Sequence, residues 1–179
     1  KKLPFIDEYF TEIGIVMNSV GQPYYTTIHD NYANYLDYVI NTAATYEFIE
    51  KHGLNLDDYE DNIQRMYDDY IGFRSQIWAH SGDMYDKIFE HFGVTYEQYY
   101  WYESQQSVLY TLIYEQLTPQ QLTELHGFYE TFLDDRAPQI EAFKNRFAKY
   151  DATALFEACT IKKYTFETNY EEDMTEPTE

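Results

Sequence analysis

The sequence predicts an all-α protein: a compact bundle of about seven or eight helices, followed by an acidic C-terminal tail. Apolar residues recur every three or four positions over long segments, and with 7 Gly and 5 Pro the residues that break helices are sparse. Residues 164–166 form the one segment that resembles an extended piece. The chain is 44% hydrophobic and 20% aromatic, unlike a disordered acidic chain. We expect a single helical domain over residues 1–165 and the tail at 166–179.

The first four predicted helices end at glycine or proline. Gly53 and Gly93 follow the second and fourth of them, where glycine readily takes the left-handed conformation that ends a helix. The four segments cover about Pro4–Val20, His29–Lys51, Asp57–His80 and Asp83–Phe92.

The later helices begin at recognisable caps. A threonine followed three residues later by glutamine forms a capping box, which satisfies the first free amides of a helix. Thr95 with Gln98, and Thr118 with Gln121, match this pattern and predict the fifth and sixth helices. We expect a seventh from near Pro138 and an eighth over residues 153–162.

The charge of the chain excludes several functions. It has 12 basic and 32 acidic residues, a net charge of −20, so direct binding to nucleic acid or to anionic lipid is disfavoured. We find no membrane span, no signal peptide, no histidine spacing for a metal site and no catalytic motif. We therefore expect a soluble, non-enzymatic protein without cofactors, in which the single Cys159 is a buried apolar residue.

The charges are unevenly distributed. Residues 3–135 carry 4 basic and 23 acidic side chains, residues 136–165 carry 6 basic and 3 acidic, and residues 166–179 carry 6 acidic and none basic. We expect the basic segment to dock on the protein's own acidic helices; the alternative is a separate acidic partner.

Acidic residues are predicted to form one outward face. On the third helix they project opposite the apolar stripe, interrupted only by Arg65, and they continue on the following helices at steps that bring carboxylates about 5 to 6 Å apart. This spacing is close to that of phosphates along a nucleic-acid strand. The predicted partner-binding face consists of Asp57, Asp58, Asp61, Asp68, Asp69, Asp83, Asp86, Glu90 and Glu97.

Two other features call for partners. Arg74 falls within the apolar stripe of its helix, so we expect it to form a buried ion pair with Glu47 or Glu50, or to line a polar pocket. On the fifth helix, Tyr96, Tyr100 and Tyr114 lie opposite its leucine-rich face. Either this helix is central in the bundle, or it exposes an aromatic face to a partner or to a second copy.

The all-helical pattern, the acidity, the many tyrosines and the stretch IYEQLT at residues 113–118 resemble the Ocr-like DNA-mimic anti-restriction proteins of phages. The resemblance implies a phage or mobile-element protein that works in the cytoplasm of a host cell. It would occupy the DNA-binding cleft of a basic host protein and would have no catalytic residues.

Three hypotheses follow from the sequence. The first is a DNA-mimic inhibitor of a DNA-binding or defence protein. The second is a virion or adaptor protein that assembles through its tyrosine faces, as a homo-oligomer or with a neighbour. The third is a small helical enzyme with a polar pocket near Arg74.

Overall fold

The computed structural model describes residues 2–20, 28–81 and 84–147, and this part of the chain is an all-α bundle without strands. It contains seven α-helices and one short 3₁₀ helix, η1, in agreement with the predicted fold class. Their bounds are α1 Glu8–Val20, α2 Ile28–Lys51, η1 Leu56–Tyr59, α3 Glu60–Ser81, α4 Met84–Phe92, α5 Tyr96–Gln116, α6 Pro119–Asp135 and α7 Ala137–Phe147.

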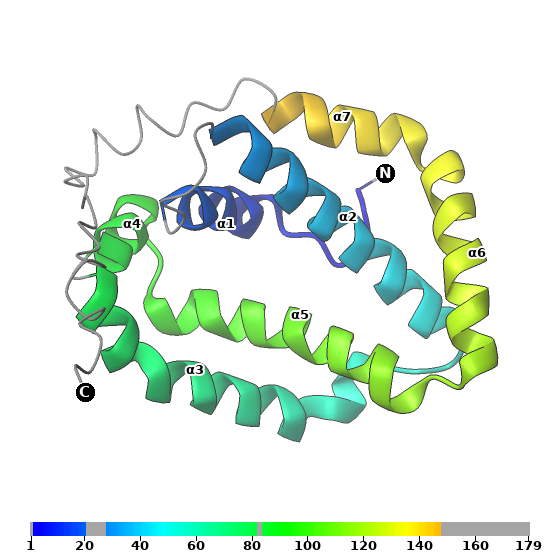
Figure 1. The fold of residues 1–179 in the computed structure, drawn as a ribbon, viewed down its shortest axis with the longest axis horizontal. Helices are drawn as coiled ribbons and strands as arrows, with labels where there is room; N and C mark the ends of the chain where they lie inside the picture. Colours follow the sequence, from blue (N-terminus) through cyan, green and yellow to red (C-terminus); the bar gives the residue numbers. More distant parts are fainter. Residues whose placement is uncertain (1, 21–27, 82–83, 148–179) are drawn as a thin grey trace, which may run out of the picture.

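Helix α5 is the centre of the bundle. Figure 1 shows α3 running alongside it on one side and α2 on the other, with α4 at one end, α6 at the opposite end and α7 beyond α2. The N-terminal half of α5 packs with α1 and α4, while its C-terminal half packs with α2, α3 and α6. A third cluster joins α2 to α6, α7 and the N-terminal segment. Residues on all sides of α5 are therefore buried.

Both predicted capping boxes are present. The amide of Gln98 donates to the Thr95 hydroxyl at 3.1 Å, and the amide of Thr95 donates to the Gln98 side chain at 2.9 Å. The same reciprocal bonds join Thr118 and Gln121, at 3.2 and 2.9 Å. The local sequence thus fixes where α5 and α6 begin.

Two helix starts differ from the predicted ones. Helix α1 begins at Glu8 rather than Pro4, because Phe5 adopts a positive φ of 60° and the Asp7 carboxylate accepts from the amides of Tyr9 and Phe10. Residues 56–59 form η1, so α3 begins at Glu60. The predicted ends at Gly53 and Gly93 are confirmed, since both have positive φ.

The predictions for the C-terminal region fall on residues outside the described part of the chain. They are the eighth helix at 153–162, the extended piece at 164–166, the acidic tail at 166–179 and the burial of Cys159.

Candidate acidic interaction surface

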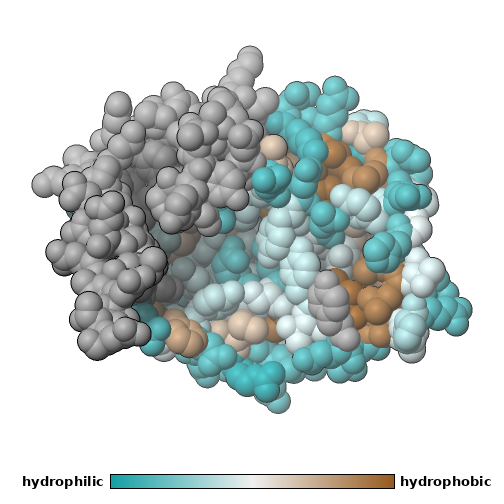
Figure 2. All heavy atoms as spheres, viewed as in Figure 1, coloured by the Kyte–Doolittle hydropathy of each residue, from teal (hydrophilic) through white to brown (hydrophobic). Residues whose placement is uncertain are grey.

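The carboxylates of η1 and α3 form an exposed acidic surface that Arg65 interrupts. Asp57, Asp58 and Asp61 lie at the start of this helical segment, and Asp68 and Asp69 lie two to three turns further on; all five are exposed. Figure 2 shows hydrophilic side chains along the outer edge of the molecule, where Figure 1 places α3. We call these five residues the α3 acidic surface.

The position of each carboxylate on the helix determines which interactions stabilise it. Asp57, Asp58 and Asp61 occupy first turns, where the positive end of the helix dipole stabilises acidic side chains. Asp68 and Asp69 lie in the middle of α3, where no dipole end favours them. The Gln64 amide donates to Asp68 at 2.8 Å and orients its carboxylate. Glu60 is also exposed, and the prediction omitted it although it lies between Asp58 and Asp61.

The ion pairs of the protein lie mainly away from this surface. Within the described residues, no ion pair includes a member of the α3 acidic surface. The cations of α6 and α7 instead bind acids on other helices: Arg136 pairs with Glu47 at 2.7 Å and Lys144 with Asp37 at 2.7 Å. Residues 136–147, the described part of the basic segment, therefore dock internally, and their cations do not pair with the α3 acidic surface.

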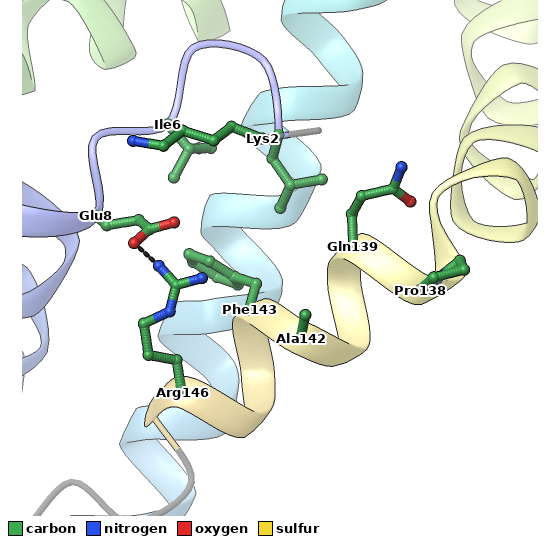
Figure 3. A pocket seen from close by; sticks show the side chains of 9 residues that line it. Lys2, Ile6, Glu8, Pro138, Gln139, Ala142, Phe143 and Arg146 are labelled. Atoms are coloured by element: carbon green, nitrogen blue, oxygen red, sulfur yellow. Dashed lines mark ion pairs between the residues drawn. The ribbon is translucent and has the colours of Figure 1, made fainter.

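Figure 3 shows a third contact of this kind. Arg146 of α7 points toward Glu8 and forms an ion pair with it, beside a cavity of about 500 Å³ between α7 and the N-terminal segment. Lys149, Lys162 and Lys163 of the predicted basic segment lie outside the described residues.

The predicted pairing of Arg74 with Glu47 or Glu50 is wrong. Arg74 donates to Glu97 at 3.1 Å and lies 3.4 Å from Asp86, and its guanidinium stacks over the Tyr96 ring at 4.5 Å from the centroid. The prediction failed because α5 separates α3 from α2, so the partners of Arg74 come from α4 and α5.

Glu47 has other partners, and its titration reflects them. Burial by itself raises the pKa of Glu47, but the hydrogen bonds and charges of Lys51 and Arg136 lower it below its ordinary value overall. Glu47 therefore fastens the start of α7 to α2. Glu50 is exposed at the end of α2.

Arg74 also changes the extent of the predicted acidic face. Asp86 and Glu97 are the carboxylates it pairs with, so the two form part of a link between α3, α4 and α5. Its own backbone amide does most to lower the pKa of Glu97, and Arg74 adds to this, so the side chain is charged at neutral pH. Glu90 is exposed on α4, whereas Asp83 lies outside the described residues.

Two of the three tyrosines in the aromatic face predicted on α5 are buried. Tyr96 and Tyr100 are 2% and 8% exposed and pack against Phe89 of α4 and Tyr70 of α3. Of the two alternatives, the central position of α5 is confirmed. The side chain of Tyr114 lies outside the described residues.

A polar cluster inside the bundle was not predicted. The Tyr99 hydroxyl donates to Glu103 at 2.7 Å, and the neighbouring Tyr35 and Tyr102 are also buried. Burial raises the pKa of Glu103, against the lowering effect of Tyr99, and burial also raises the pKa of Tyr102 to about 12. The sequence feature that could have predicted this cluster is that polar residues occur on every side of α5.

A shallow groove of about 660 Å³ lies between α1, α3 and α5. Aromatic rings form much of its wall: Tyr67 and Trp101 meet edge to face at 5.5 Å, and Phe10 stacks on Tyr102 at 4.8 Å. Glu97 lies on its lining, next to the α3 acidic surface.

Other kinds of site find no support in the described residues. No three His, Cys, Asp or Glu side chains there lie close enough together to hold a metal ion. None of the helices described is both long and apolar enough to cross a membrane. Comparisons with protein-family models, with curated proteins and with solved structures gave no match.

Proposed function

We propose that the protein is a non-enzymatic inhibitor that binds a basic, DNA-handling host protein in the place of nucleic acid. The observation that supports this most directly is the α3 acidic surface: five exposed carboxylates along one helical segment, unpaired within the described residues, in a chain of net charge −20.

The distribution of the cations strengthens this proposal. An ordinary acidic surface is expected to carry interspersed lysines and arginines. Here Arg136, Lys144 and Arg146 are directed to Glu47, Asp37 and Glu8, and Arg65 is the one basic residue between Asp57 and Asp69. The resulting field attracts a basic surface of the kind that binds phosphates.

The other two hypotheses have less support. Assembly through the tyrosines of α5 requires rings that are accessible, and Tyr96 and Tyr100 are buried. An enzymatic pocket at Arg74 requires a free guanidinium, and this one is engaged by Asp86, Glu97 and the Tyr96 ring.

The test is competition with DNA. Basic proteins captured from host lysate at low salt are purified, bound to a labelled duplex and titrated with this protein, and displacement of the duplex is followed by fluorescence anisotropy. We expect displacement that weakens steeply as salt rises, because the contacts are charge pairs. A captured protein that binds duplex and inhibitor at the same time would contradict the proposal.

The variant Asp68→Asn/Asp69→Asn is expected to displace the duplex more weakly than the wild-type protein. Its matched control is Glu130→Gln/Glu141→Gln, which removes the same charge from exposed positions on α6 and α7. Equal loss in both variants would mean that net charge, rather than the α3 acidic surface, determines binding.

A further inference from the structure

The groove between α1, α3 and α5 has a composition that suits one kind of side chain. Its walls combine aromatic rings, among them Tyr9, Tyr67 and Trp101, with the amide side chains of Gln64 and Gln105. Tyr9 is 43% exposed, an unusual degree for a large ring in this protein. The groove thus offers flat ring surfaces and hydrogen-bond acceptors together.

The lining of the groove carries one acidic group. Among the described residues that line it there is one carboxylate, Glu97, which also pairs with Arg74 at 3.1 Å, and no basic side chain. Burial raises the pKa of the Tyr67 hydroxyl, and the negative charges of Glu97 and Asp68 raise it further. Both carboxylates therefore act on the ring that forms the groove wall.

We propose that this groove binds an arginine side chain of a basic partner. A guanidinium is planar, stacks on aromatic rings and presents five N–H donors to carbonyl and carboxylate oxygens. A lysine ammonium has the same charge, but it is a compact, strongly hydrated group without a flat face. A neutral sugar also stacks on rings, but it gains nothing from Glu97, Asp68 or the net charge of the protein.

This inference rests on the proposed function, which it extends by naming the side chain that the protein recognises. The α3 acidic surface attracts a basic partner from any direction along its length. The groove, which Gln64 and Tyr67 of the same helix help to line, adds a preference for arginine and fixes the position of the partner.

The first experiment needs no variant. Isothermal titration calorimetry compares two pentapeptides of equal charge, one alternating glycine with arginine and the other glycine with lysine. We expect the arginine peptide to bind about twofold to fivefold more tightly, the range given by a cation–π contact at an exposed site. Equal binding of the two peptides would overturn the inference.

The location is tested by NMR. The indole N–H resonance of Trp101 is identified by its loss in Trp101→Phe, and we expect it to shift with the arginine peptide. An arginine peptide that binds but leaves this resonance unchanged would place the site elsewhere. Displacement of the peptide by a neutral oligosaccharide would overturn the choice of ligand.

Variants of Tyr67 then separate stacking from charge. Tyr67→Ala is expected to remove the preference for arginine, and Tyr67→Phe to keep it, because phenylalanine retains the ring. Asp58→Asn, which lies outside the groove, should weaken both peptides alike. Circular dichroism shows whether each variant is folded.

The two proposals fail in different ways. If a captured basic protein is displaced from DNA while the peptides show no preference for arginine, the groove inference is wrong and the proposed function stands. If the arginine preference is present but no captured protein gives up its duplex, the groove stands and the proposed function is wrong.

Discussion

Gly14 of α1 lies directly against the hydroxyl of Tyr35 of α2: a Cβ placed on residue 14 would be 1.9 Å from the Tyr35 oxygen and 2.5 Å from the ring carbon that carries it. Tyr35 is buried and its ring stacks near Tyr38, so it has little room to withdraw. The absence of a side chain at Gly14 therefore sets how closely α1 approaches α2.

We expect Gly14→Ala to destabilise the protein by about 1 to 3 kcal/mol, as overpacking of a core does. The control is Gly72→Ala in α3, where nothing lies within 4 Å of the new Cβ. Because alanine favours helix more than glycine, the control should be stabilised by about 0.5 to 1 kcal/mol. Urea unfolding measures both. Stabilisation by both alanines would show that the contact with Tyr35 is not restrictive.

The ion pair between Arg136 and Glu47 fastens α7 to α2, and both side chains are less than one-fifth exposed. Replacing Arg136 by methionine leaves the half-buried Glu47 carboxylate with Lys51 as its one ion-pair partner among the described residues. We therefore expect the free energy of unfolding to fall by about 1.5 to 3 kcal/mol. Lys144→Met, at a pair whose side chains are about half exposed, should cost less than about 1 kcal/mol. Similar losses in the two variants, measured by denaturant unfolding, would contradict this difference.

Glu103 should make stability fall as the pH rises. Its folded-state pKa is raised by burial, so above the ordinary glutamate pKa of about 4.3 the unfolded chain loses this proton more readily than the folded protein. The resulting penalty grows until the pH passes the raised value. Glu103→Gln, whose amide oxygen still accepts from Tyr99, should therefore be more stable than the wild-type protein at neutral pH and equal to it near pH 4.

Glu47→Gln is the matched contrast, because the pKa of Glu47 is lowered in the folded state. Its stabilising effect is present above the ordinary glutamate pKa and disappears as the pH falls through the lowered one. This variant should be less stable than the wild-type protein at neutral pH and approach it in acid. If the stability difference from the wild-type protein changes with pH in the same direction for both glutamine variants, one of the two assignments is wrong.

Local signals predicted most of the fold. Thr95 and Gln98 lie only three residues apart, and the residues that end α2 at Gly53 are also close in sequence, so their geometry depends little on the rest of the chain. The start of α1 was mispredicted, because Asp7 caps it and the turn at Phe5 is stabilised by stacking on Tyr46, forty residues away.

The candidate site was predicted only where it depends on one helix. Periodicity places Asp68 and Asp69 opposite the apolar stripe of α3, and both are exposed. The partners of Arg74 depend on which helix lies beside α3, and periodicity carries no such information. The groove around Trp101 depends on three helices at once, so the periodicity of a single helix could not predict it.

The two parts of the α3 acidic surface should respond differently to neutralisation. Asp57→Asn/Asp58→Asn removes charges that the helix dipole favours, so at low salt we expect a stability loss of about 0.3 to 1 kcal/mol for each residue. Asp68→Asn/Asp69→Asn removes mid-helix charges and should change stability by less than about 0.5 kcal/mol. Both variants should weaken binding to a basic partner.

A surface under selection for stability alone has a reason to hold acids in the first turns but none to hold Asp68 and Asp69. Thermal unfolding at low and high salt, together with binding of each variant, therefore separates the two roles; unchanged binding in Asp68→Asn/Asp69→Asn would remove the middle of α3 from the interaction surface.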